Sequence, residues 1–143
     1  MLIHQDVYLN ASTNVLNSRE LNGFLPFLKN TMSKFSEAEL VEFTVAPQVT
    51  PSEGLPYHEW LVEFTHLPAD PTAFNQTLDA EMVKQNTYYN DLITGNILRP
   101  LKLTALPKGA FIDYMKSIGK LGGQNKVPRL SNDRKVANAL LNL

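Results

Sequence analysis

The strongest constraint on the fold is a pair of neighbouring segments, residues 39–46 and 57–66, in which apolar and polar residues alternate. Successive side chains of a β-strand point to opposite faces, so this alternation predicts two half-buried strands. The residues expected on the buried faces are Val41, Phe43 and Val45 in the first segment and His58, Trp60, Val62 and Phe64 in the second. Residues 47–56 hold three prolines and one glycine and predict a loop. Two strands joined in this way most simply pair antiparallel.

Apolar residues at helical spacing predict four helices around these strands. Ser18 is expected to cap the first, and the second begins at Asp70 and runs to about Gly95. The third is short and stops at Gly119, and Ser131 is expected to cap the last. Their apolar stripes are, in order, Leu21, Phe24, Leu25, Leu28 and Met32; Phe74, Leu78, Met82 and Tyr89; Phe111, Tyr114, Met115 and Ile118; and Val136, Ala139, Leu140 and Leu143.

A third strand, in which Leu101, Leu103 and Ala105 alternate with polar residues, separates the second and third helices. The order of elements is then helix, strand, strand, helix, strand, helix, helix. This order predicts an α+β fold, a small mainly antiparallel or mixed sheet with helices packed on it. With 143 residues and 43% hydrophobic content, the chain is expected to form a single domain over residues 1–143.

The polar residues of the strands and the histidines do not predict a reactive centre. Glu59 and Glu63 share the polar face of the second strand and are expected to solvate the outer face of the sheet. His58 and His66 lie without metal-ligand spacing, so a structural role is favoured over a metal site. The chain has no cysteine, which excludes disulfides and thiolate metal sites and fits a reducing cytoplasm.

Charge is distributed unevenly along a chain that is nearly neutral as a whole. Residues 1–94 hold 12 acidic and 4 basic residues, whereas residues 95–143 hold 9 basic and 2 acidic residues. Such asymmetry favours an anionic ligand or an acidic partner on the basic part. The basic charge centres on the glycine-broken segment 119–134, GKLGGQNKVPRLSNDR, which is expected to be an exposed, mobile loop over residues 119–130. The alternative is that these charges only solvate a surface.

Several classes of function lack their signatures. The segment 119–134 has no aromatic residue, so it lacks the interleaved aromatic and basic residues that nucleic-acid binding needs. No phosphate-loop or nucleophile-elbow motif occurs. No apolar run is long enough to span a bilayer, and no signal peptide is visible at the N-terminus. The expectation is a cytoplasmic protein that binds neither membrane nor nucleic acid.

The segment 119–134 resembles the terminal motif of the Gretchen Hagen family, the auxin-responsive acyl acid amido synthetases and their bacterial relatives. Further stretches are similar to successive elements of that family's C-terminal domain: residues 39–47, 58–64, 78–89, and the Pro-x-Gly-x-Phe turn at 107–111. The resemblance covers residues 37–143, and residues 1–36 form an N-terminal segment and helix outside it.

The resemblance implies the C-terminal lid domain of an ATP-dependent acyl acid–amino acid amide synthetase. In this family a large N-terminal domain holds ATP and the acyl acid, and the small domain closes over them with a lysine from a mobile loop. By position in the motif that catalytic lysine is Lys126, and the substrate-binding residues are Gly122, Gly123, Gln124 and Arg129. Compared with Lys126, the basic residues Lys120, Arg129 and Arg134 are expected to be supports or surface charges.

ATP and Mg²⁺ are implied for the complete enzyme, with none expected on this chain alone. The implied partners are the large adenylation domain and the acyl acid and amino acid substrates. Because every ATP-binding motif belongs to the missing domain, the chain is not expected to be active alone. Two other interpretations stay open from the residues: a stand-alone module that binds an anionic metabolite or an acidic partner protein through the basic loop, and a nucleic-acid-binding domain.

Overall fold

The structure, a computed structural model, describes residues 24–122 and 126–143. Within these ranges the helices are α2 (Phe24–Met32), α3 (Pro71–Gln85), α4 (Thr87–Thr94), α5 (Ala110–Ser117) and α6 (Lys135–Leu141). The strands are β1 (Glu39–Gln48), β2 (Tyr57–His66) and β3 (Lys102–Leu106). The predicted first helix is present in its second half as α2, whereas Ser18 and Leu21 lie outside the described residues.

The three strands form one mixed sheet in the order β1-β2-β3. β1 pairs antiparallel with β2, from Glu39 opposite His66 to Gln48 opposite Tyr57, as the alternating segments predict. β2 pairs parallel with β3, with Trp60 opposite Leu103. Parallel neighbours need a crossover connection, and α3 and α4 supply it. The predicted α+β fold with a small mixed sheet is therefore confirmed.

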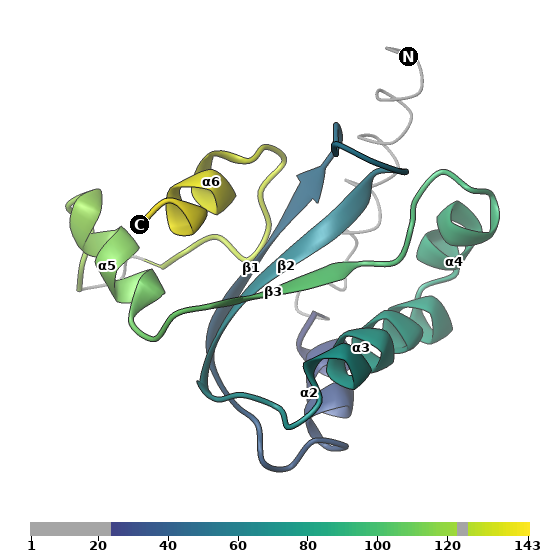
Figure 1. Cartoon of the computed structure of the whole chain (residues 1–143), viewed down its shortest axis with the longest axis horizontal. Coiled ribbons are helices and arrows are strands. Elements are labelled where there is room, and N and C mark those ends of the chain that lie inside the picture. The colour runs from purple at the N-terminus through teal and green to yellow at the C-terminus, as the bar shows by residue number, and fades with distance from the viewer. Residues whose placement is uncertain (1–23, 123–125) are drawn as a thin grey trace.

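Helices cover both faces of the sheet, so that β2 is buried on both sides. In Figure 1, α2, α3 and α4 lie on one face and α5 and α6 on the other. Phe43, Trp60 and Val62 point into the core beneath α2–α4, together with Phe74, Leu78 and Met82 of α3. Ala46 and Leu61 point into the second core, which also contains Phe111 and Met115 of α5 and Ala137 and Leu140 of α6.

This second helical layer corrects the expected role of two glutamates. Glu59 and Glu63 were predicted to solvate an outer face of the sheet, but they are only 5% and 4% exposed. The alternation of polar and apolar residues identified the two faces of β2 correctly. It could not reveal that α5 and α6 cover the polar face, because those helices come from the far end of the chain.

A bulge in β1 corrects the expected face of Val41. Leu40 lies opposite Phe64 and Glu42 lies opposite Glu63, so β1 holds one extra residue at this point. The extra residue is Val41, whose side chain is 48% exposed, while Leu40 packs against the core instead. The bulge therefore places Val41 on the α5 side of the sheet, next to Glu42 and beside the segment 119–130, which we call the glycine loop.

The predicted long helix over residues 71–95 is two helices with a break at Asn86. Asp70 caps α3 with a 3.0 Å hydrogen bond from the Ala73 N–H, as expected. Asn86 adopts an extended conformation (φ −131°, ψ 100°), and its side-chain oxygen accepts from the Tyr89 N–H. The cap starts α4 in a new direction, which brings the fully buried Tyr89 into the core.

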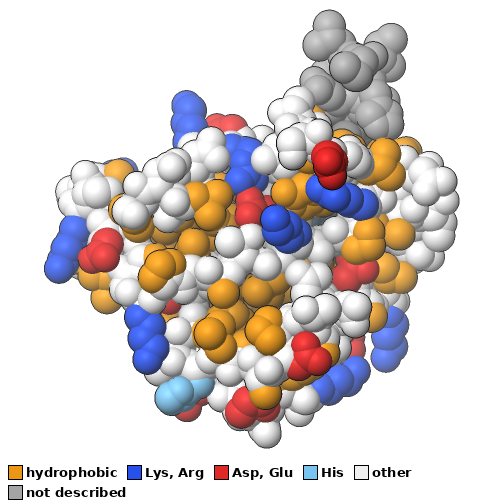
Figure 2. All heavy atoms as spheres, in the orientation of Figure 1, with side chains coloured by type: hydrophobic (Ala, Val, Ile, Leu, Met, Phe, Trp, Pro, Cys, Tyr) orange, Lys and Arg blue, Asp and Glu red, His pale blue; other side chains and the backbone are white. Residues whose placement is uncertain are grey.

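The outer edge of β3 is partly closed by a side chain of α3. The Asn75 amide donates to the Leu101 carbonyl at 2.9 Å and accepts from the Leu103 N–H, which is the pattern that a residue of a neighbouring strand would make. Figure 2 shows hydrophobic side chains on the side of the molecule that carries this edge. Leu103 and Ala105 line a groove beside α3 at this edge.

Candidate functional site

The glycine loop leaves α5 through a well-formed helix stop. Ile118 is the C-cap of α5, and Gly119 follows it with a φ of +70°. The Gly119 N–H bonds the Lys116 carbonyl at 3.0 Å, and the Lys120 N–H bonds the Met115 carbonyl at 2.9 Å. These two hydrogen bonds form a Schellman motif, which needs a residue in the left-handed conformation at the position of Gly119. The predicted helix stop is confirmed, although Ile118 is 44% exposed rather than part of the apolar stripe.

The far side of the loop, residues 127–131, runs along the edge of β1. The Val45 N–H bonds the Arg129 carbonyl at 2.9 Å, and the Ser131 N–H bonds the Val45 carbonyl at 3.0 Å, which makes a parallel bridge between Val45 and Leu130. The Thr44 hydroxyl donates to the Pro128 carbonyl at 2.6 Å. We call residues 127–131 the return limb.

The loop therefore has two unlike parts, and the expectation of an exposed loop over residues 119–130 is only partly right. Residues 119–122 and Lys126 are exposed. In the return limb, by contrast, Val127 is only 7% exposed and packs into the core beneath α5 and α6. The difference arises because the free edge of β1 offers backbone hydrogen-bonding groups that the return limb satisfies.

An ion pair fixes the chain just beyond the return limb. The Arg134 guanidinium donates to Glu59 Oε1 at 2.6 Å and to the Pro47 carbonyl at 3.4 Å, and Glu59 Oε2 accepts from the Thr104 hydroxyl at 2.6 Å. Arg134 is therefore a partly buried support and not a surface charge, with its side chain 18% exposed. Ser131 does not cap α6 as expected, because the helix begins at Lys135, whose N–H bonds Asp133.

A second buried carboxylate holds the start of α5. Glu63 accepts from the Gly109 N–H at 2.9 Å and from the Phe111 N–H at 3.1 Å. A negative charge at this place satisfies two otherwise unpaired N–H groups and complements the positive end of the helix dipole. The Pro-x-Gly-x-Phe turn is thus fastened to the central strand, and α5 delivers the glycine loop to one defined place.

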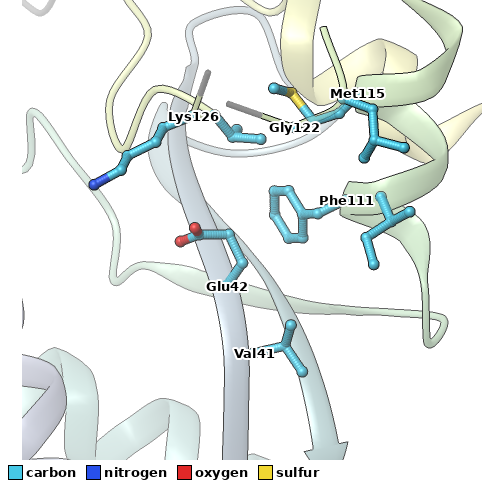
Figure 3. A pocket seen from close by; sticks show the side chains of 9 residues that line it. Val41, Glu42, Phe111, Met115, Gly122 and Lys126 are labelled. Carbon is cyan, nitrogen blue, oxygen red and sulfur yellow. The ribbon is translucent and has the colours of Figure 1, made fainter. Parts of the chain in front are cut away.

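A small pocket of about 240 Å³ lies where α5, β1 and the glycine loop meet. Its wall is mainly apolar, and its polar side chains are Glu42 and Lys126; the lining residues are Val41, Glu42, Phe111, Ile112, Met115, Leu121, Gly122, Lys126 and Val127. In Figure 3, Lys126 extends its ammonium group away from Phe111 and Met115, and Glu42 rises from β1 between Lys126 and Phe111. The exposed ammonium at the rim is available to an anion from outside the domain.

The structure brings some of the predicted site residues together. Gly122 and Lys126 line the pocket, and Gly122 has a φ of +87°, a conformation that favours glycine. Gly123 and Gln124 lie outside the described residues. Arg129 lies in the return limb, where its Nε is 3.1 Å from Glu42 Oε1 and its guanidinium stacks on the Phe43 ring at 4.6 Å.

Glu42 and Thr44 are the site residues that sequence reasoning missed. Both occupy the polar face of β1 in an ordinary alternating pattern, which carries no sign of a special role. Their partners, Arg129 and Pro128, are more than 80 positions away in the chain. The charge asymmetry was the one available signal, because two cations of the basic part pair with two acids of the acidic part, Glu42 and Glu59.

The histidine and metal expectations concern residues away from this pocket. His58 is fully buried against Tyr89, with ring centroids 5.7 Å apart, and burial lowers its pKa to about 4. Its imidazole is therefore neutral near pH 7. The described part of the chain contains no group of three or more His, Asp or Glu side chains arranged to hold a metal ion. Among the helices of that part, none has the length and apolarity to cross a membrane.

The family profile described as the GH3 family C-terminal domain matches residues 25–135. No curated protein matches the sequence significantly.

Two solved structures are similar in fold. One is described as GH3.15 acyl acid amido synthetase, with a TM-score of 0.67 and 16% sequence identity over 83% of this chain. The other is AtGH3.15 acyl acid amido synthetase in complex with 2,4-DB, with a TM-score of 0.63 and 16% identity over 86% of this chain. The chain spans only 22% and 23% of the length of these two proteins.

Proposed function

The chain belongs to the GH3 family through its C-terminal domain, and from that premise we propose that it acts as the lid of an ATP-dependent acyl acid–amino acid amide synthetase. In the proposed reaction the carboxylate of the acyl acid attacks the α-phosphate of ATP, which gives an acyl-adenylate and releases pyrophosphate. The amine of an amino acid then attacks the acyl carbon, which forms the amide and releases AMP.

The observation that carries this proposal is the presentation of Lys126. An exposed lysine stands at the end of a limb fastened to β1, and a glycine-containing segment precedes it. A lysine ammonium is a compact point charge on a flexible stem, which suits a phosphate whose geometry changes during reaction. Placed positive charge is the main contribution that a protein makes to phosphoryl and adenylyl transfer.

The other residues of the loop have supporting roles in this proposal. Gly122, Gly123 and Gln124 would approach the phosphates with backbone and side-chain amides, as the resemblance implies. Substrate binding by Arg129 also stays a prediction from the resemblance. In this scheme the large domain binds ATP and Mg²⁺, as the resemblance implies.

The rim of the pocket is the face that would meet the large domain when Lys126 is delivered. Ile112 and Leu121 are each 52% exposed and Val41 is 48% exposed, and all three surround the pocket that Lys126 borders. Exposed apolar side chains gathered at one place are typical of a protein–protein contact. In the two-domain enzyme, Ile112→Glu should therefore weaken adenylation, whereas Leu67→Glu, at a similarly exposed leucine outside the pocket, should not.

The decisive experiment compares Lys126→Ala with Lys120→Ala in the two-domain enzyme. Loss of one preorganised donor costs about 2–4 kcal/mol of transition-state stabilisation, so the rate of acid-dependent ATP–pyrophosphate exchange should fall roughly 30- to 1,000-fold for Lys126→Ala. Lys120→Ala should retain nearly all activity. If both variants exchange pyrophosphate at the wild-type rate, Lys126 has no catalytic role and the proposal is wrong. The isolated chain should fold but show no exchange.

The alternative is a stand-alone module that holds an anionic metabolite or an acidic partner protein. It has weaker support, because Arg129 and Arg134 are paired with glutamates inside the domain and contribute less charge to an external ligand. Tight binding of ATP or an acidic peptide by the isolated chain, lost in Lys126→Ala, would favour this alternative.

A further inference from the structure

We propose that the Glu42–Arg129 pair, together with Thr44, is a positioning device that fixes where Lys126 is presented. This inference rests on the proposed function of Lys126, which it deepens by naming the residues that aim the lysine. Lys126 is one residue before the return limb, so any displacement of the limb displaces the lysine.

The Arg129 side chain is held on two sides by β1. Its Nε lies 3.1 Å from Glu42 Oε1, and its guanidinium carbon lies 4.6 Å from the centre of the Phe43 ring. The same Glu42 oxygen accepts from the Phe43 N–H at 2.9 Å, so the carboxylate is itself oriented by the strand. A planar guanidinium can meet a carboxylate with its edge and an aromatic ring with its face at once.

The backbone around Arg129 is held by the same strand. The Arg129 carbonyl accepts from the Val45 N–H, and the Pro128 carbonyl accepts from the Thr44 hydroxyl. Four consecutive residues of β1, Glu42 to Val45, therefore contact the side chain or the backbone of the return limb. The contact with Glu42 uses the Nε atom and the Phe43 ring covers one face of the guanidinium, so the Arg129 side chain lies against β1.

The alternation of faces along β1 explains why Glu42 can reach the limb. Phe43 points into the core beneath α2–α4, so its neighbours Glu42 and Thr44 lie on the side of the sheet that faces the loop. The extra residue at the bulge places Val41 on that side as well. Glu42 also lines the pocket that Lys126 borders, so the positioning pair and the lysine lie at one place.

The first test measures the limb in the isolated full chain by amide hydrogen exchange. The reporters are the Val45 and Ser131 N–H groups, which bond across the junction between β1 and the limb. Glu42→Gln and Arg129→Gln should each lower the protection of these amides roughly fivefold, because a half-exposed ion pair contributes modestly. Thr44→Val should do the same and Thr44→Ser should not. The matched control is Glu39→Gln, which changes an exposed carboxylate of the same strand that does not contact the limb.

The second test measures adenylation in the two-domain enzyme. Displacing a catalytic group lowers kcat more than it weakens substrate binding. Glu42→Gln and Arg129→Gln should therefore each lower kcat roughly 10-fold and leave the KM for ATP unchanged. The double variant should be no worse than either single variant, because both remove the same contact. Arg129→Lys should be intermediate, since an ammonium cannot make both contacts at once.

The two tests separate this inference from the function on which it rests. Unchanged protection at Val45 and Ser131 in both single variants overturns the positioning device whatever the activity. A raised KM for ATP in Arg129→Gln but not in Glu42→Gln overturns it in favour of substrate binding by Arg129. If protection of the Val45 and Ser131 amides falls as expected but Lys126→Ala leaves adenylation intact, the Glu42–Arg129 pair does hold the return limb. The proposed function and the positioning role are then both wrong.

Discussion

Removing the Arg134 guanidinium should destabilise the domain severely, because it leaves a carboxylate buried without its cation. Arg134→Met keeps much of the apolar stem but deletes the donor that lies 2.6 Å from Glu59 Oε1. The side chains of Glu59 and Arg134 are 7% and 18% exposed, so little water can replace the lost partner. The Thr104 hydroxyl continues to donate to the other carboxylate oxygen.

The expected cost follows from the burial of this pair. Breaking a buried ion pair by removing one partner typically costs about 3–5 kcal/mol, most of it from the uncompensated charge that remains. Because Arg134 keeps some contact with solvent and Glu59 keeps its bond from Thr104, the lower end, about 3 kcal/mol, is the better expectation. Most of this penalty should disappear in the double variant Arg134→Met/Glu59→Gln, in which no charge stays buried.

Urea denaturation monitored by the fluorescence of Trp60 measures these free energies of unfolding directly. The matched control is Lys135→Met, which removes the exposed cation next in the chain and should change stability by less than about 0.5 kcal/mol. If Arg134→Met costs no more than Lys135→Met, or if the double variant is less stable than Arg134→Met, the pair does not anchor the end of the glycine loop as described.

Three further outcomes follow from the structure. Burial lowers the pKa of His58 from 6.5 to about 4, so between these pH values the unfolded chain binds a proton that the folded chain does not. The free energy of unfolding should therefore fall by up to about 3 kcal/mol as the pH drops from 6.5 to 4. Denaturation curves of His58→Leu measured over the same pH range should lack this dependence. Gly119→Ala should cost about 1 kcal/mol in the same assay, since its φ is +70° and no described atom obstructs a Cβ, and Gly119→Asn should recover part of the loss. Asn86→Ala removes the cap of α4 and should cost about 1 kcal/mol, with helix loss visible by circular dichroism.

Local sequence patterns predicted several strands and helix ends correctly and one helix incorrectly. The alternation in residues 39–46 and 57–66 predicted β1 and β2 and their antiparallel pairing, and Asp70 and Gly119 marked true helix ends. The helix over residues 71–95 was continuous in the prediction because apolar spacing continues across residue 86. The competing signal was Asn86 itself, whose side chain stabilises a helix start by a local hydrogen bond.

For the candidate site, the sequence predicted which residues carry charge but not which contacts they make. The position of Lys126 in a basic, glycine-broken segment can be read from the sequence, and so can its resemblance to the family motif, although its catalytic role stays a prediction. The contacts of Glu42 with Arg129 and of Glu59 with Arg134 could not be read in this way. Each partner alone resembles an ordinary surface charge.

The sequence by itself determined the class of fold, the family and the location of the glycine loop, because these depend on periodicity, turn residues and a local motif. Only the tertiary structure decided that the polar face of β2 is buried, that Val41 bulges outward, and that the return limb lies on β1. Those features depend on α5, α6 and residues 127–131 packing against strands that precede them by dozens of positions. Burial and hydrogen-bond satisfaction are properties of the assembled layers, and no local pattern of residues records them.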